Sequence, residues 1–121
     1  FLGVGFWAPN PKDLFRIRKE LEFDADELRT LMADTNFKKY WGDLQGDEVK
    51  TAPKGFSKEH SNIDLIRKKQ YTFHKQLNDD QVMSKYFLDL VDEHFMQIRP
   101  FFDYMSSVLT TDLNGESLLR E

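Results

Sequence analysis

Cysteine is absent from the 121 residues, which excludes a disulfide scaffold, a thiolate nucleophile and a cysteine-ligated zinc site. No apolar run approaches the roughly 20 residues needed to cross a bilayer, and no cleavable signal is evident. We therefore expect no membrane partner and a cytoplasmic location. Internal repeats and low-complexity stretches are also lacking, so a solenoid or an extended linker is not expected.

What is present fits an ordinary globular domain. The chain is 40% apolar and 31% charged, and its length is typical of one domain, so we expect residues 1–121 to form a single domain that needs no metal or cofactor. Eleven phenylalanines among the aromatic residues predict a core built around aromatic rings.

Charge is distributed unevenly along the chain. Residues 1–37 carry a net −2, residues 38–75 a net +4 and residues 76–121 a net −6. A basic middle segment could mark an anion site, or the basic and acidic segments could simply face each other. The overall charge of −4 argues against broad nucleic-acid binding, because such binding neutralises many phosphates.

The first half of the chain predicts a strand and two helices. Phe1–Trp7 is aromatic and interrupted by glycine, as in a strand with a bulge or a close backbone approach. Asn10 as N-cap and Pro11 in the first turn predict a helix over residues 11–22. Asp24 and Glu27 have capping-box spacing and predict a second helix that ends near Asp34.

Residues 36–69 are less regular. Two short extended runs around a Gly- and Asp-rich turn suggest a loose hairpin over residues 37–50, although an aromatic helical turn at 36–41 is nearly as consistent. A turn at Pro53–Phe56 follows. Ser61 or His60 is then expected to cap a short helix that ends near Lys68.

The last part of the chain predicts a strand and a long helix. Residues 70–77 alternate in polarity and are expected to pair with Phe1–Trp7. A capping box at Asn78 begins the longest helix, whose buried face should include Met83 and His94. Pro100 should kink or restart this helix, and residues 110–121 should form a frayed tail. The expected fold is α+β, with four to five helices and a small, mostly antiparallel sheet.

The densest polar stretch, Lys50–Lys69, is the candidate site. Lys54 and Gly55 lie in a turn before a helix start and could offer a cation and backbone donors to a phosphate-type anion. His60 and Arg67 would be further cations. This is not a P-loop, because its Gly and Lys spacing is absent. The alternative interpretation is a structural Pro-Gly turn whose lysines stay solvated.

The sequence offers weaker candidates for catalytic, metal-binding and nucleic-acid-binding residues. No catalytic motif is present and no catalytic residue is assigned: the acidic pair Asp79-Asp80 fits a helix start better than general acid–base work. The three histidines lack helical metal-pair spacing, and His94 is expected at the edge of the core, so no metal site is assigned. Aromatic residues beside lysines at 37–41 could stack on nucleic-acid bases, but core packing explains them more simply.

Several motifs together resemble a known family. They are F-W-x-P-x-P-x-x-L-x-x-I-R at residues 6–18, G-D-L-Q-G-D-E-V-K at 42–50, P-K-G-F at 53–56, E-H at 59–60 and D-L-I-R-K-K-Q at 64–70. Together they resemble the C-terminal half of a widespread family of conserved hypothetical proteins, a domain of unknown function whose members are typically about twice this length. The resemblance covers nearly all of residues 3–109 and implies no established reaction.

Two departures from the family pattern matter. Members usually have proline after the histidine, where this chain has Ser61. The family's N-terminal half also carries a segment of the form R-D-x-R-F-S-x-D-K-x-P-Y, which nothing here matches. Since the chain also begins at Phe1 in an apolar run, we expect it to be the C-terminal part of a longer protein.

Three functional hypotheses follow. The first is a non-catalytic scaffold or interaction portion, with either the missing N-terminal half or a second copy contacting Phe1–Trp7. The second is the anion site, as part of an enzyme acting on phosphorylated substrates. The third is an adaptor that uses the acidic residues 76–121 to bind a basic partner.

Overall fold

The computed structural model describes residues 2–7 and 9–111, and this part of the chain contains two strands and six helices. In chain order they are β1 (Leu2–Phe6), α1 (Pro11–Phe23), α2 (Asp26–Ala33), α3 (Thr35–Trp41), α4 (Ile63–Ile66), β2 (Tyr71–Lys75), α5 (Asp79–Met83) and α6 (Phe87–Thr110). The fold is therefore α+β with a small antiparallel sheet and a long C-terminal helix, as the sequence predicts.

Strands β1 and β2 pair antiparallel, which confirms the predicted pairing of the two segments. Val4 lies opposite Phe73, and Gly5 lies opposite Thr72. Gly5 has a φ of 133°, and a Cβ atom there would clash with the carbonyl oxygen of Tyr71. The expected close backbone approach within the first strand is thus confirmed, and it explains why glycine occupies this position.

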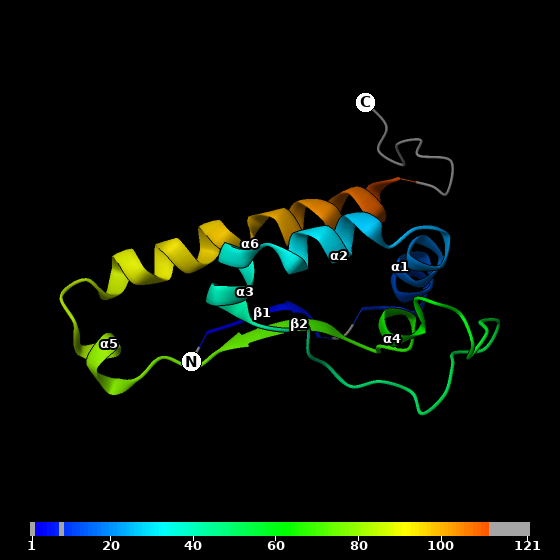
Figure 1. Ribbon diagram of the computed structural model, residues 1–121, viewed down its shortest axis with the longest axis horizontal. Helices are drawn as coiled ribbons and strands as arrows, with labels where there is room; N and C mark the ends of the chain where they lie inside the picture. Colours follow the sequence, from blue (N-terminus) through cyan, green and yellow to red (C-terminus); the bar gives the residue numbers. More distant parts are fainter. Residues whose placement is uncertain (1, 8, 112–121) are drawn as a thin grey trace.

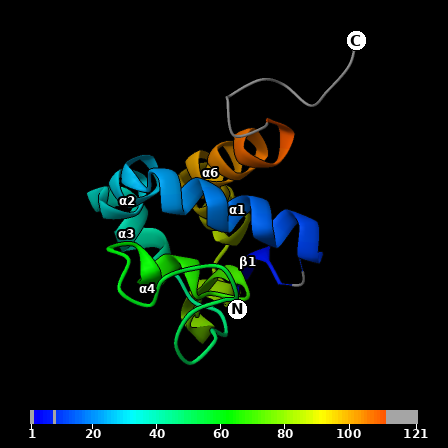
Figure 2. The ribbon, with the colours of Figure 1, turned by 90° about the vertical axis from the view of Figure 1, so that its right-hand side faces the viewer.

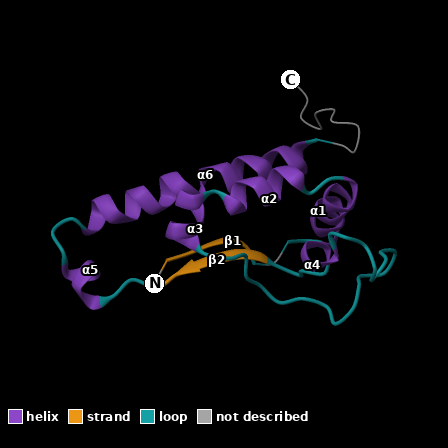
Figure 3. Cartoon of the chain, in the orientation of Figure 1, coloured by secondary structure: helices purple, strands orange, loops and turns teal. Residues whose placement is uncertain are grey.

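The long helix α6 and the two-stranded sheet lie on opposite sides of α3 (Figures 1 and 3). Helix α2 packs along α6, and α5 lies at the far end of the molecule from α1 (Figure 1). The view turned by 90° shows α1 crossing α6, with the short α4 close to α1 (Figure 2). This arrangement encloses a core between α1, α2, α3, α6 and the sheet.

The core is built around aromatic rings, as the composition predicts. Phe73 meets both Phe37 and Phe101 edge to face, with ring centroids 5.1 and 5.0 Å apart. Trp41 and Tyr71 are also buried completely or nearly so. Each such ring removes a large apolar area from water, so α3, α6 and β2 are held together mainly by these contacts.

Helix α1 begins as predicted and α2 does not. The Asn10 side chain accepts a hydrogen bond from the backbone N–H of Asp13, with Pro11 in the first turn. The capping box predicted at Asp24 is wrong: α2 begins after Ala25 with no side-chain cap. Asp24 instead accepts from the N–H of Asp26, a local turn that competes with capping-box geometry.

The predicted hairpin over residues 37–50 is wrong, and the alternative of a helical turn is confirmed by α3. Asp34 supplies the reason, because its carboxylate accepts from the backbone N–H of Phe37 and caps α3. Burial of Phe37 and Trp41 on one face then stabilises the helix. Residues 42–50 form only two isolated bridges, Gln45 with Thr72 and Glu48 with Lys68.

Two predicted helix starts in the second half need correction. Helix α4 begins after Asn62, without a side-chain cap, so neither Ser61 nor His60 caps it. The capping box at Asn78 is confirmed but begins the short α5 rather than the long helix. Ser84 separates α5 from α6, because it is extended and its hydroxyl accepts from the N–H of Tyr86.

Helix α6 continues through Pro100 as one helix of 24 residues, which excludes a restart and leaves a kink as the prediction for Pro100. The expected burial of His94 is confirmed, whereas Met83 is 83% exposed because α5 turns away from the core. Of the expected tail, residues 112–121 lie outside the described part of the chain. No helix among the described residues combines the length and apolarity required to cross a bilayer.

Candidate functional site

The predicted anion-binding turn projects from the molecule. The backbone N–H of Phe56 donates to the carbonyl of Pro53 at 3.1 Å, which closes the turn that carries Lys54 and Gly55. Both residues are exposed, and Gly55 has a φ of 90°, a conformation that favours glycine. The turn therefore presents Lys54 to solvent, as either interpretation of this segment requires.

Arg67, the second predicted cation, is engaged with the backbone. Its guanidinium donates to the carbonyls of Val49 and Lys50, with Nε 2.9 Å from the Val49 oxygen. Its Nε also lies 3.9 Å from the Glu48 carboxylate. These contacts hold the 45–50 segment against the chain that leads into β2, so an anion would have to compete with them for this guanidinium.

His60 is partly engaged as well. Its Nδ1 accepts a hydrogen bond from the backbone N–H of Asn62 at 3.0 Å. The Asn62 side chain in turn donates to the Leu21 carbonyl and accepts from Arg29, so this turn is tied to α1 and α2. The helix that follows has only four residues, and its N-terminus offers a weak dipole.

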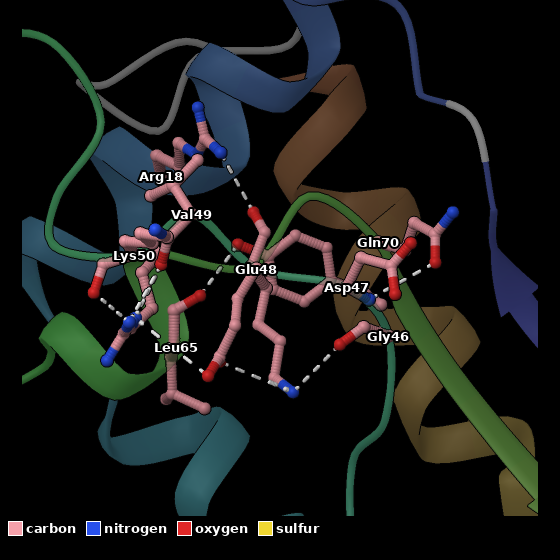
Figure 4. Close-up of polar contacts among 11 residues, drawn as sticks. Arg18, Gly46, Asp47, Glu48, Val49, Lys50, Leu65 and Gln70 are labelled. Atoms are coloured by element: carbon pink, nitrogen blue, oxygen red, sulfur yellow. Dashed lines mark hydrogen bonds and ion pairs between the residues drawn. The ribbon is translucent and has the colours of Figure 1, made fainter.

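Arg18 makes a second set of contacts between a cation and the backbone in the same region. It extends from α1 and donates to the carbonyls of Ile66 and Lys68, each at 2.9 Å. Burial lowers the pKa of Arg18 below its ordinary value, although the guanidinium stays charged. Figure 4 shows Arg18 above the 46–50 segment. Three cations in this region, Arg18, Arg67 and Lys68, thus donate to carbonyls, whereas the other lysines of the segment are exposed.

A different pocket brings cations together with a buried histidine. It has a volume of about 270 Å³ and lies among α3, β2, α5 and α6. It is lined by Lys39, Tyr40, Lys75, Gln81, Leu90 and His94. The Tyr40 hydroxyl donates to the Glu93 carboxylate at 3.2 Å, and this carboxylate is the largest cause of a raised Tyr40 pKa.

His94 is only 3% exposed, and its two ring nitrogens differ. Nδ1 lies 2.7 Å from the Leu90 carbonyl, which can only accept, so this nitrogen carries the hydrogen. In the neutral ring Nε2 is then an acceptor, and it is buried without a partner. A buried acceptor without a donor is costly, which makes this nitrogen a candidate contact for a ligand that carries a hydroxyl.

Comparison with known proteins adds a family to this geometry. A family model described as a conserved hypothetical protein, DUF2461, matches residues 1–104. The chain belongs to this family. Neither the curated proteins nor the solved structures gave a significant match to the chain. The predicted resemblance is therefore confirmed, and the family description assigns no reaction.

For this family member, sequence reasoning found the exposed turn but missed the pocket around His94. Lys39 and Lys75 are 36 positions apart, and only the packing of α3 against β2 brings them to one pocket. No local motif signals this juxtaposition; the one available hint is a histidine on the buried face of a helix. Among the described residues, no group of three His, Cys, Asp or Glu side chains is placed to hold a metal ion.

Proposed function

We propose that this chain is a non-catalytic interaction domain of its family, and that β1 is the strand through which it binds a partner. The observation that supports this is the position of β1 at the edge of the sheet. Within residues 2–7 and 9–111, β1 pairs with β2 on one side and with no strand on the other. An edge strand presents unpaired N–H and C=O groups that can pair with another strand.

The composition of this edge favours pairing. Residues 1–7 contain no charge, whereas natural edge strands are commonly protected by lysine or proline. Gly3 is exposed, lies next to the buried Val4 and has no side chain, so it would not obstruct an approaching strand. Trp7 and Phe102 are also exposed beside the strand, and the Phe102 ring meets Phe6 at 6.4 Å.

A second copy of the chain is the partner that we propose. Antiparallel pairing of β1 with its own copy is self-complementary and would convert two strands into a four-stranded sheet. A sheet of two strands alone is marginally stable, so this extension would be favourable. The family's N-terminal half, if it belongs to this protein, is the alternative occupant of the same edge.

The test is the mass of the chain in solution as a function of concentration. Sedimentation equilibrium should show a dimer that dissociates on dilution, and Gly3→Lys should weaken dimerisation by at least tenfold because it places a charge on the edge. Thr51→Lys adds the same charge at an exposed position away from β1 and should not change the mass. A monomer at millimolar concentration, or equal effects of both variants, would refute the proposal.

Anion binding is a second candidate function, now favoured at the pocket around His94. A phosphate monoester carrying a hydroxyl could donate to Nε2 while it accepts from Lys39 and Lys75. Phosphate titrated into the chain should bind, and Lys39→Ala with Lys75→Ala should abolish binding. Lys12→Ala with Lys58→Ala, at exposed positions elsewhere, is the control with the same charge change. Equal loss in both double variants would mean that only net charge matters.

A further inference from the structure

Two cavities form one groove between α2 and α6. The first has a volume of about 510 Å³, and its lining residues include Asp26, Glu27 and Asp103. The second, of about 230 Å³, is lined by Asp34. Both cavities share Thr30, Leu31 and Pro100, so they adjoin. We call these two cavities the acidic groove.

The carboxylates of the groove have few ion-pair partners, although Arg29 on the same helix interacts electrostatically with Asp26. In the described part of the chain, no ion pair joins Asp26, Glu27 or Asp34 to a cation. Asp103 lies 3.9 Å from Arg99, but both side chains are largely exposed, and such a pair is weak. The Asp34 carboxylate also caps α3, and it keeps further acceptor capacity.

Tyr104 gives an independent indication of a ligand. Its side chain lines the larger cavity and is 5% exposed, yet its hydroxyl has no hydrogen-bond partner. Burial, followed by the charges of Glu20, Glu27 and Asp24, raises its pKa well above the ordinary value, so the hydroxyl stays neutral. A neutral hydroxyl under the influence of nearby carboxylates can accept a hydrogen bond from an N–H donor on a cation.

The shape of the groove selects among cations. Leu31 and Pro100 form an apolar floor between its two acidic ends. Asp26 begins α2 and Asp34 directly follows its last residue, so their backbone positions lie about 12 Å apart at 1.5 Å per residue. The carboxylates are therefore too dispersed for one metal ion, consistent with the lack of a metal-binding group among the described residues.

We propose that the acidic groove binds a linear aliphatic polyamine. Its ammonium groups would contact the carboxylates at the two ends and the Tyr104 hydroxyl, and its methylene spacers would cover Leu31 and Pro100. The separation of the acidic ends matches an extended triamine with three- and four-carbon spacers. This site is separate from the β1 edge and from the pocket around His94.

Calorimetric titration of the full chain with spermidine tests the proposal. Spermidine should bind saturably, with affinity at least tenfold higher than 1,4-diaminobutane, which is too short to reach both ends. Glu27→Gln and Asp103→Asn should each weaken spermidine binding by roughly tenfold, as expected for loss of a charge-assisted contact. Asp92→Asn, an exposed carboxylate of α6 outside both cavities, should change the affinity by less than about twofold.

The same titrations define the results that overturn the proposal. Absence of saturable spermidine binding would do so, as would equal weakening by Asp92→Asn, which would indicate attraction by net charge alone. Equal affinity for spermidine and 1,4-diaminobutane would remove the length argument. A lysine-rich peptide that binds in a Glu27-dependent way, while spermidine does not bind, would show a peptide site instead. Circular dichroism of each variant checks that the fold is retained.

Discussion

The basic segment at residues 45–69 and the acidic groove between α2 and α6 have opposite charge, and they also differ in how their polar groups are satisfied. Beside the basic segment, Arg18 of α1 donates to the carbonyls of Ile66 and Lys68, and within the segment Arg67 donates to the carbonyl of Val49. In the acidic groove, Asp26 and Glu27 have no ion-pair partner among the described residues, and the Tyr104 hydroxyl has no hydrogen-bond partner.

Charged groups that bond to the backbone stabilise the fold, whereas charged groups without an ion-pair partner remain available to a ligand. Backbone carbonyls outside regular strands still need hydrogen-bond donors. A guanidinium that donates to two of them supplies the bonds that a neighbouring strand would otherwise provide. A buried hydroxyl without a partner lowers stability and is retained at binding sites more readily than in a core. The two arginines in and beside the basic segment are therefore structural, whereas the lysines at 50, 54, 58 and 69 are exposed.

Arg18→Ala should have the largest effect on stability. It leaves the carbonyls of Ile66 and Lys68 without their donors beside the buried core, so we expect a loss of about 2–4 kcal/mol. Urea unfolding measures this loss. Lys12→Ala, at an exposed position of the same helix, should cost less than about 0.5 kcal/mol. Similar costs for both variants would mean that the carbonyls are equally well satisfied by water.

Arg67→Ala should have the next largest effect, about 1–3 kcal/mol, because the 45–50 segment loses its main anchor. Amide exchange should accelerate at Val49 and Lys69, whose N–H groups bond across the same contact. Arg67→Lys should recover only part of the loss, because one ammonium group cannot reproduce the paired N–H donors of the planar guanidinium. Unchanged exchange at both amides would show that the segment is held by other contacts.

Two buried tyrosines provide the third test. Tyr104→Phe should stabilise the chain by about 1 kcal/mol, because it removes a hydroxyl without a partner. Tyr71→Phe is the matched control: its hydroxyl donates to the Leu65 carbonyl at 2.9 Å, so its removal should cost about 1 kcal/mol. Both changes are measured by urea unfolding. A loss of stability in Tyr104→Phe would show that the hydroxyl has a favourable partner and would weaken the polyamine proposal.

The sequence predicted those parts of the fold that depend on local signals. Asn10 with Pro11, and Asn78 with Gln81, mark helix starts through contacts within three residues, and both are confirmed. The aromatic, Gly-interrupted segment 1–7 and the alternating residues 70–77 contain β1 and β2, which pair as expected. The prediction of a capping box at Asp24 was wrong because its carboxylate can accept from the N–H two residues ahead as easily as from the N–H three residues ahead. The sequence does not encode this choice.

The candidate sites were less predictable because they depend on contacts between distant segments. The exposed turn at Lys54 follows from Pro53 and Gly55 alone. That Arg67 would be engaged by Val49 could not be inferred, since the partner is a carbonyl and any residue could provide it. The acidic groove requires the packing of α2 on α6, which brings Glu27 to Tyr104 across 77 positions.

The pair of Arg29 and Asp64 should show a small effect with a defined pH dependence. The hydrogen bond from Arg29, at 2.7 Å, is the main cause of a lowered Asp64 pKa. A lowered pKa in the folded state gives stability that is full above the unfolded value, about 4, and is lost as the pH falls through the folded value. Because the Asp64 side chain is 60% exposed, we expect only about 0.2–1 kcal/mol at pH 7.

Urea unfolding of Asp64→Asn at pH 7 and pH 3 measures this effect. The difference between the parent chain and the variant should shrink at pH 3, as the parent carboxylate becomes protonated. Asp92→Asn, which the structure places at an exposed position of α6, should show no comparable change with pH. A difference that grows toward pH 3 would reverse the sign of the inferred pKa change.

Lys54→Ala should have the smallest effect on stability, below about 0.5 kcal/mol, because the side chain is exposed and its turn is closed by the backbone. This variant distinguishes the two candidate anion sites, the exposed turn at Lys54 and the pocket around His94. If phosphate binds around His94, Lys54→Ala retains binding while Lys39→Ala loses it; calorimetry of both variants compares them directly. Loss in Lys54→Ala alone would return the anion site to the exposed turn. The basic segment would then bind a ligand as well as maintain the fold, and the contrast with the acidic groove would hold only for Arg18 and Arg67.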